Sequence, residues 1–329
     1  MTISIRKYQQ SDKNIWDSFV DKANNGVLFH YRDFLSYHIG REFNDHSLIF
    51  TKNNKLVAIF PAAEVERDGK KILYSHPGTS YGGFVTNTPG FGTCSAMIES
   101  FDIYCKNNGF NEIFFIPPPL SYSKIIDETL DYVLLRNEYK NNEIYISSVI
   151  NIEDDVDAQL QQTYKNKKRS KSFYKRLILD NNVTFEWAKN YAEFYPILVD
   201  NKKRLGAKPT HTLDELYLLD KQFPNHFHLL MMYSNKKPVG GTLNFVANSN
   251  TAIVFYNMID YNFKSLQPAT LQMFETIKWA KRNGFYNLDF GVSQLPSADD
   301  PLTPSPNLIR FKEEFGAQAV IRKSFRKLL

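Results

Sequence analysis

Two charged residues near the end of the chain have types and positions that could do chemistry: an aspartate in an apolar run and a lysine beside a phenylalanine. Asp289 lies inside the run Asn287–Phe290, and Lys312 follows Arg310 and Phe311. A buried carboxylate is costly unless it is paired or hydrogen-bonded, so one interpretation of Asp289 is a buried ion pair with a lysine or arginine. The other is catalytic: an aspartate can orient or accept a proton. Basic residues beside a buried phenylalanine can hold a phosphate or stabilise a developing oxyanion.

A second group of charges lies in the middle of the chain. Residues 165–176 contain seven basic residues in twelve. Phe173, Leu177 and Ile178 supply a partial apolar face, so the pattern predicts a basic amphipathic helix. It is either a solvated surface helix or a platform for an anionic donor or acceptor.

Two further candidates are aromatic or lie in a turn. The segment 75–83 contains three glycines between expected strands and is typical of a structural turn. Its alternative role is the lip of an acceptor cleft, with His76 and Tyr81 facing substrate. Tyr256, on an expected strand at 252–259, is interpreted either as a core residue or as a substrate contact.

Several kinds of chemistry are poorly supported by the sequence. P-loop, HExxH, CxxC and GxSxG patterns are absent, and the seven histidines show no metal-ligand spacing. Cys94 and Cys105 have no activating basic neighbour except Lys106. Hydride transfer, metal-dependent hydrolysis and serine or cysteine nucleophilic catalysis are therefore not expected, and no tightly bound cofactor or metal is predicted.

A repeated order of elements must position these residues. Two apolar runs joined by a short Asn/Lys turn occur at 47–60 and again at 227–245, which predicts two β-hairpins. After each hairpin come an amphipathic helix, an Asn-Gly-Phe stop and a strand, at 97–116 and at 271–290. The same order occurring twice predicts two similar domains in tandem.

The predicted fold class is α/β, with two tandem domains at residues 1–152 and 153–329. Each domain is expected to be a mixed, mostly antiparallel sheet flanked by helices. Thr212 and Glu215 predict a capping box at the start of one of these helices. The apolar run 132–135 is predicted to be a strand.

The repeated unit resembles the GNAT acyltransferase fold, and three segments resemble its Fem-like branch, which includes peptidoglycan-bridge aminoacyltransferases and BioF2-like acetyltransferases. Segment 28–38 resembles the family's early f-l-Q-s-x-x-W-x-x-x-K pattern, and 164–206 resembles its basic helix followed by R-x-g. The most specific similarity is Leu288-Asp-Phe-Gly291 with Ile309-Arg-Phe-Lys-Glu-Glu-Phe-Gly316, which resembles y-D-f-G … l-x-x-F-K-x-x-F-G.

The resemblance implies roles for the matching positions. The pair Phe311-Lys312 would lie on the donor side, and Asp289 would lie near the substrate groove. Arg204 would contact a phosphate of the acceptor, and His38 takes the place of the family's lysine in the first domain. The proline-rich loop 296–306 would border the site.

The identity of the donor depends on the segment 264–270. GNAT domains that bind acyl-CoA resemble one another in a Q/R-x-x-G-x-G/A loop whose amides hold pyrophosphate. Gln267 could begin such a loop and Lys264 lies beside it, but both glycines are missing and Pro268 has no N–H. Acyl-CoA and aminoacyl-tRNA therefore both remain expected donors.

Charge and composition fit this interpretation. The chain has 329 residues and a net charge of +5. Residues 1–153 carry 15 basic and 18 acidic side chains, and residues 154–329 carry 25 and 17, so the balances are −3 and +8. The basic half is expected to meet an anion. Two cysteines, no signal-like start and no long apolar stretch predict a soluble cytoplasmic protein.

Together these features predict an N-acyltransferase. It would move an acyl or aminoacyl group from a CoA thioester or aminoacyl-tRNA to a primary amine. The acceptor would be a nucleotide-linked or lipid-linked glycan or peptide precursor of the cell envelope, such as peptidoglycan, with peripheral membrane association. The alternative is a non-catalytic GNAT-like protein that binds an anionic glycan or RNA.

Overall fold

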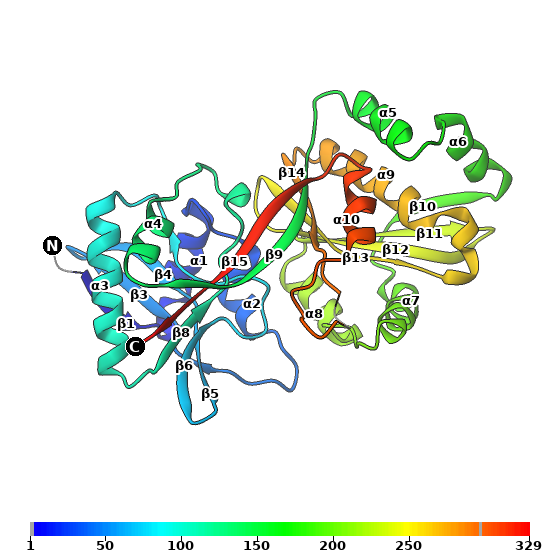
Figure 1. Ribbon diagram of the computed structural model, residues 1–329. Helices are drawn as coiled ribbons and strands as arrows, with labels where there is room; N and C mark the ends of the chain where they lie inside the picture. Colours follow the sequence, from blue (N-terminus) through cyan, green and yellow to red (C-terminus); the bar gives the residue numbers. More distant parts are fainter. Residues whose placement is uncertain (1–2, 296–297) are drawn as a thin grey trace. The chain divides into compact units, whose positions relative to one another are not determined.

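The computed structural model describes residues 3–295 and 298–329 of the chain (Figure 1). The chain divides into two compact units, residues 1–144 with 321–329 and residues 145–320. The final segment of the chain, residues 321–329, thus belongs to the first unit. The predicted domains, 1–152 and 153–329, place this segment in the second.

Two sheets form the first unit. One has the strand order β1-β3-β4-β7 and is antiparallel; in the other, β8 pairs with β6 in parallel and with the end of β15 antiparallel, and β5 and β2 follow β6. The strands are β1 Ile3–Lys7, β2 Asn44–Asp45, β3 Leu48–Lys52, β4 Lys55–Phe60, β5 Ala63–Arg67, β6 Lys70–Ser75, β7 Val85–Thr86, β8 Glu112–Phe115 and β15 Gln318–Leu328. The helices are α1 Lys13–Lys22, α2 Arg32–Ser36, α3 Phe91–Asn107 and α4 Thr129–Arg136, with 3-10 helices η1 Gln10–Asp12, η2 Leu28–His30 and η3 Leu120–Tyr122.

One sheet forms the second unit, with the order β10-β11-β12-β13-β14-β9. Its pairs are antiparallel except β13 with β14, which are parallel. The strands are β9 Lys140–Asn151, β10 Val183–Trp187, β11 Phe227–Ser234, β12 Lys237–Val246, β13 Thr251–Ile259 and β14 Asn287–Val292. The helices are α5 Val156–Asn166, α6 Lys171–Asp180, α7 Tyr191–Arg204, α8 Leu213–Gln222, α9 Pro268–Arg282 and α10 Pro306–Glu313, with the 3-10 helix η4 Tyr261–Leu266.

The two predicted hairpins are confirmed as β3–β4 and β11–β12. The first turns through Asn53 and Asn54, at φ 50° and 60°, and the second through Asn235 and Lys236, at φ 48° and 65°. Two consecutive residues with positive φ form a type I′ turn, whose twist matches the twist of the two hairpin strands. Asparagine tolerates positive φ better than most residues do. The Asn/Lys turns therefore reveal both hairpins in the sequence.

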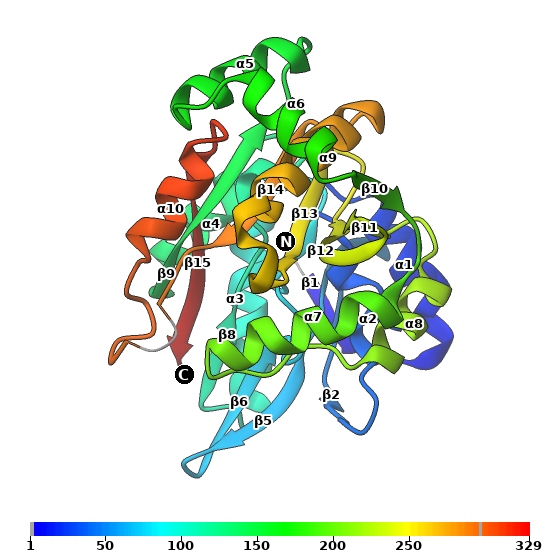
Figure 2. The ribbon, with the colours of Figure 1, turned by 90° about the vertical axis from the view of Figure 1, so that its right-hand side faces the viewer.

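Two adjacent glycines of β12 show which helices cover the sheet of the second unit. A Cβ atom added at Gly240 would lie 2.9 Å from Nε2 of Gln272 in α9, and one added at Gly241 would lie 2.7 Å from Cδ2 of Phe194 in α7. Because neighbouring strand residues point to opposite faces, α9 and α7 pack on opposite faces of this sheet, as Figures 1 and 2 show. Both helices approach the backbone closely because β12 has no side chains there.

Strands β13 and β14 pair over only three residues each. The parallel register joins Thr251–Ile253 to Asn287–Asp289, after which β13 continues to Ile259 without β14. Strand β14 stays with β9 through a bulge between Asp289 and Val292. A bulge bends a strand and re-aims its side chains. The two strands therefore diverge directly after Asp289.

The basic segment is two helices rather than the single helix predicted for 165–176. Helix α5 ends before Lys168, which adopts φ 52°, and α6 begins after Ser170. The Ser170 hydroxyl accepts a hydrogen bond from the amide of Phe173 at 3.1 Å. Ser170 is therefore the N-cap of α6, because its side chain bonds an amide in the first turn of that helix. The predicted single helix is interrupted at this N-cap.

The run 132–135 lies in α4 and is not the predicted strand. Four apolar residues fit a buried strand and a helix face equally well, so periodicity did not decide between them. By contrast, the capping box at α8 is confirmed: the Thr212 hydroxyl accepts from the Glu215 amide at 3.1 Å, and the Thr212 amide donates to Glu215 Oε2 at 2.8 Å.

Both predicted helix stops, at Gly109 and Gly284, are confirmed. Substituting them by alanine measures the cost of backbone strain, which can be compared with the cost of a packing collision at Gly241. Gly109 and Gly284 adopt φ 72° and 74° with open space around an added Cβ, so alanine at either position costs about 1 kcal/mol of backbone strain. Gly241→Ala has no such strain but would collide with Phe194, and we expect it to cost about 2 kcal/mol or more.

Urea denaturation of the three variants measures these losses in the free energy of unfolding. Similar losses at Gly109 and Gly284 with a larger loss at Gly241 are expected. An equal loss at all three positions would contradict the close packing of α7 on β12.

Candidate functional site

Asp289 is fully buried in β14, at the point where the strands diverge. Its Oδ1 accepts a hydrogen bond from the Ser147 hydroxyl of β9 at 2.8 Å and one from the Gly291 amide at 2.6 Å. Charge-assisted bonds of this kind offset the cost of removing a carboxylate from water. Asp289 thereby fixes both the bulge of β14 and its contact with β9.

Lys312 of α10 is 4% exposed, and its ammonium is directed at the end of β14. It donates to the carbonyl oxygens of Gly291 and Val292 at 2.7 and 3.0 Å and to the Ser293 hydroxyl at 2.8 Å. An ammonium has three protons, so each is matched by one acceptor. Burial lowers the pKa of Lys312 to about 8, while the nearby Asp289 acts in the opposite direction. We name Asp289, Lys312 and the backbone of 291–293 the β14 cluster.

Helix α10 is held in place by an aromatic and charged contact with the end of α5. The Phe311 and Phe315 rings lie 5.2 Å apart, and the Lys167 ammonium lies 4.7 and 4.3 Å from their centres. Lys167 also forms a 2.7 Å ion pair with Glu314. Phe311 thus supports the helix that carries Lys312. Arg310 on the same helix is exposed and lies 3.9 Å from Glu314.

The stretch of β13 that β14 does not pair is tied to two helices. The Asn201 side chain in α7 donates to the Ile259 carbonyl at 2.7 Å and accepts from the Ile259 amide at 3.3 Å. The Asn257 side chain donates to the carbonyl of Ala269, at the start of α9, at 3.2 Å. The end of α7 and the start of α9 therefore border the diverging part of β13.

Two of the predicted acceptor contacts lie at this border. Arg204 ends α7, is exposed, pairs with Asp200 at 2.7 Å and lies 4.5 Å from the Tyr261 ring centre. Tyr256 is only 2% exposed, and its hydroxyl accepts from the Thr210 amide at 3.2 Å. The burial of Tyr256 favours the core interpretation, and its role as a substrate contact stays a prediction.

The start of α9 offers few free amides to a phosphate. Gln267 precedes the helix at φ 51°, and its carbonyl accepts from the amides of Thr270 and Leu271 at 3.0 and 3.1 Å. Pro268 has no amide proton, and the amides of Thr270 and Leu271 are used in these bonds. In the first turn of α9, this leaves the amide of Ala269 outside these bonds. The nearby Lys264 is exposed. A pyrophosphate cradle of several amides is therefore not built here.

Six exposed basic side chains surround the turn between α5 and α6, and we name them the α5–α6 surface. They are Lys165, Lys168, Arg169, Lys171, Lys175 and Arg176. Among the described residues, none of the six takes part in an ion pair. The Tyr174 hydroxyl of α6 donates to Gln267 Oε1 at 3.4 Å, which places this surface beside the start of α9.

The predicted residues of the first unit form two aromatic groups. The rings of His38 and of His76, which belongs to the turn at 75–83, lie 5.2 and 5.3 Å from the Phe43 ring centre. His76 donates its Nδ1 proton to the Pro77 carbonyl at 2.6 Å, and burial lowers its pKa to about 4, so it is neutral at pH 7. Tyr81 is 5% exposed and lies 5.4 Å from the Phe29 ring. Their contact with substrate stays a prediction.

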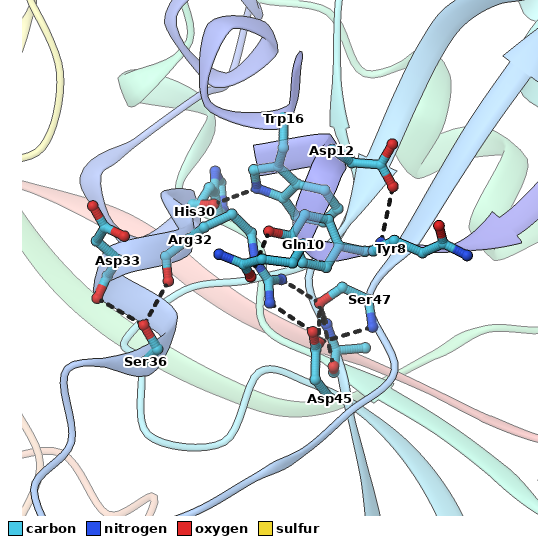
Figure 3. Close-up of polar contacts among 12 residues, drawn as sticks. Tyr8, Gln10, Asp12, Trp16, His30, Arg32, Asp33, Ser36, Asp45 and Ser47 are labelled. Atoms are coloured by element: carbon cyan, nitrogen blue, oxygen red, sulfur yellow. Dashed lines mark hydrogen bonds and ion pairs between the residues drawn. The ribbon is translucent and has the colours of Figure 1, made fainter. Parts of the chain in front are cut away.

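Arg32 is a polar centre of the first unit that sequence reasoning missed (Figure 3). Its guanidinium donates to Ser47 Oγ at 2.8 Å and to Asp45 Oδ2 at 2.6 Å, and its centre lies 3.8 Å from that of the Tyr8 ring. Its amide donates to Asp17 Oδ1 at 3.0 Å. These bonds tie the segment 28–38 to α1, to β2 and to Ser47, the residue before β3, so Arg32 positions the segment that carries His38. Its partners Tyr8, Asp45 and Ser47 are 13 or more residues away in the sequence, so no local pattern predicts these contacts.

In the part of the chain that the structure describes, no group of three or more His, Cys, Asp or Glu side chains is placed to hold a metal ion. None of the helices in residues 3–295 and 298–329 is long and apolar enough to cross a membrane. Residues 296 and 297 of the proline-rich loop expected to border the site lie outside the described residues.

Comparison with known proteins agrees with this geometry. Residues 165–300 match the family model of an acetyltransferase (GNAT) domain. The whole fold is similar to that of FemX, with a TM-score of 0.72 at 13% identity, covering 99% of this chain and 97% of that one. It is also similar to L-PGS from Bacillus licheniformis, with 0.58 at 12% identity over 98% and 92% of the two chains. No curated protein sequence matches the chain.

A third similar structure is a tandem GNAT protein from the clavulanic acid biosynthesis pathway, with a TM-score of 0.56 at 8% identity, covering 99% of this chain and 98% of that one. At these identities the likeness concerns the fold, and it confirms the two predicted tandem GNAT-like domains. The domain match confirms the predicted acyltransferase class.

The buried Lys312 predicts a specific dependence of stability on pH. Its pKa is about 8 in the folded chain and about 10.5 when exposed, so between these values the unfolded chain binds more protons. The free energy of unfolding therefore rises with pH in this window. Relative to Lys312→Met, the wild type should gain up to about 3 kcal/mol from pH 8 to 10.5.

Chemical denaturation of both proteins in steps between pH 7.5 and 10 measures this difference, and titration of other groups cancels between them. A difference that stays flat over this range would contradict the lowered pKa of the buried Lys312.

Proposed function

Because residues 165–300 match the model of a GNAT acetyltransferase domain, we propose that this acyltransferase forms an amide by transferring an acyl or aminoacyl group from an activated ester or thioester to a primary amine. The divergence of β13 and β14, with the β14 cluster on one side, carries this proposal. An unpaired strand edge presents free backbone amides and carbonyls, which suits the positioning of an extended acyl donor.

The proposed reaction needs no enzyme-bound intermediate. The neutral amine attacks the carbonyl carbon, a C–N bond forms, and the C–O or C–S bond to the donor breaks. The amine proton leaves to water or to the departing group. Lys312 places a positive charge at the donor side and fixes 291–293, and Asp289 orients the amide of Gly291. Charge that is already oriented costs no reorganisation when the oxyanion develops.

The charge distribution supports a donor with several phosphates. The α5–α6 surface lies beside the start of α9 through Tyr174 and Gln267, and Lys167 joins it to α10. Six cations without ion pairs border the proposed donor side. Aminoacyl-tRNA fits this surface better than acyl-CoA does, because the first turn of α9 lacks the amides for a pyrophosphate.

The acceptor in this proposal is a primary amine on a nucleotide-linked or lipid-linked glycan or peptide precursor of the cell envelope. The Fem-like motif at 309–316 supports this class of acceptor. Arg204, Arg310, His38, His76, Tyr81 and Tyr256 are its proposed contacts, and Gln267 and Lys264 are proposed contacts of the donor. We also propose a cytoplasmic reaction and functional domains at 1–152 and 153–329.

A transfer assay tests the proposal with labelled acetyl-CoA and aminoacyl-tRNA as donors and UDP-linked amino sugars and amino peptides as acceptors. We expect Asp289→Asn to lower kcat/KM by about tenfold or more, because it weakens the hydrogen bonds that fix the bulge. Asp154→Asn changes an exposed carboxylate of the same unit and should leave kcat/KM within about twofold.

Equal kcat/KM for Asp289→Asn and the wild type would contradict the proposed role of Asp289 in the reaction. Thermal stabilisation by tRNA or a UDP-sugar without any transfer would favour the non-catalytic binding protein instead.

A further inference from the structure

Glu64, His46 and Tyr104 form a hydrogen-bonded chain in the first unit that the proposed reaction does not use. His46 lies between β2 and β3 and is 2% exposed, Glu64 lies in β5, and Tyr104 lies in α3. The Nδ1 atom of His46 lies 2.6 Å from Glu64 Oε1, and its Nε2 atom lies 2.9 Å from the Tyr104 hydroxyl oxygen. A carboxylate, an imidazole and a hydroxyl are thus joined in this order.

The carboxylate determines which nitrogen of the imidazole carries the proton. Burial acts to raise the pKa of Glu64, but hydrogen bonds from His46 and Lys71 bring it below its ordinary value, so Glu64 is ionised at pH 7 and only accepts. Burial lowers the pKa of His46, so its imidazole is neutral at pH 7 and has one proton. That proton is on Nδ1, facing the carboxylate. Nε2 therefore accepts a hydrogen bond from the Tyr104 hydroxyl.

Neighbouring side chains fix the carboxylate and the imidazole. The Lys71 ammonium of β6 lies 3.1 Å from Glu64 Oε2, and the Lys7 ammonium of β1 lies 3.9 Å from Glu64 Oε1. The Phe110 ring is perpendicular to the imidazole, with 4.9 Å between the ring centres. The imidazole is therefore held by a charged partner and an aromatic contact at the same time.

The order carboxylate, imidazole, hydroxyl is the one by which proteins activate a nucleophilic hydroxyl. The imidazole takes the hydroxyl proton as the oxygen attacks, and the carboxylate stabilises the imidazolium that forms. Burial raises the pKa of Tyr104 to about 12, so at pH 7 the phenol keeps its proton and needs a base to become nucleophilic. Tyr104 is partly exposed and His46 is buried, so a reagent from solution reaches the phenol and not the imidazole.

We propose that Tyr104 is a modification site, a nucleophile that accepts an acyl group from a small activated ester or thioester with His46 as its general base. The Tyr104 oxygen attacks the carbonyl carbon and passes its proton to Nε2 of His46. A new O–C bond forms, the bond from that carbon to the leaving oxygen or sulfur breaks, and the proton moves on to the leaving group. The product is an aryl ester on α3.

This site is independent of the proposed function. Its three residues belong to the first unit, whereas the match to the GNAT domain covers residues 165–300. Acylation of Tyr104 requires no amine acceptor, so either proposal can fail without the other.

Acetylation of the wild-type chain by p-nitrophenyl acetate at pH 7 tests the site against an internal control. Tyr233 is also partly exposed, and burial raises its pKa to about 12, but its hydroxyl donates to the carboxylate of Glu193 at 2.7 Å. A carboxylate is a much weaker base than an imidazole. We expect mass spectrometry to show acetylation of Tyr104 about tenfold or more faster than that of Tyr233. Equal or slower acetylation of Tyr104 would overturn the proposal.

The pH profile of the same reaction identifies the base. Between pH 7 and 8.5 the rate at Tyr104 should stay nearly constant in the wild type, because His46 is already neutral there. In His46→Gln the rate at pH 7 should fall about tenfold or more and then rise about tenfold per pH unit, because only the phenolate reacts. The rate at Tyr233 should be the same in both proteins. A wild-type rate at Tyr104 that rises with pH as steeply as that of His46→Gln would contradict the role of His46.

Discussion

The bonding of the Lys312 ammonium to the end of β14 is the interaction on which the rest of the site depends. A buried ammonium must be hydrogen-bonded, and its acceptors here are the carbonyls of Gly291 and Val292 and the Ser293 hydroxyl. Asp289 accepts a hydrogen bond from the Gly291 amide, while Lys312 donates to the Gly291 carbonyl. Both backbone groups of Gly291 are thus fixed, and so is the bulge of β14. Strand β14 therefore leaves β13 at a defined residue, and the free edge of β13 begins there.

Charged residues of this chain fall into two groups by their partners. Lys167, Arg32 and Lys312 are bonded to side chains or backbone of the described residues and hold elements together. The six side chains of the α5–α6 surface, beside the start of α9, are cations without an ion pair among the described residues. The first group holds elements together within each unit, and the second group is where we propose that an anionic substrate binds.

Features with a short-range cause were predictable from the sequence. The hairpin turns, the Thr212 capping box and the glycine stops each depend on a few adjacent residues, and all are confirmed. Asp289 was predictable because a charge interrupts an apolar run, and Lys312 because it follows Phe311 in the segment that resembles the Fem-like motif. The contacts of Arg32 depend on residues brought together by folding, so no local pattern reveals them. The capping role of Ser170 was visible in the sequence but hidden by the charge run around it.

The central claim is that substrate lies where β13 and β14 diverge. Hydrogen–deuterium exchange tests it directly, with and without non-reactive analogues of the two donors, a thioether of acetyl-CoA and an amide-linked aminoacyl-tRNA. The account predicts that the analogue of the true donor slows exchange at residues 254–259 and 289–293 and on the α5–α6 surface. Protection confined to other residues, with exchange at the two strand ends unchanged, would contradict it.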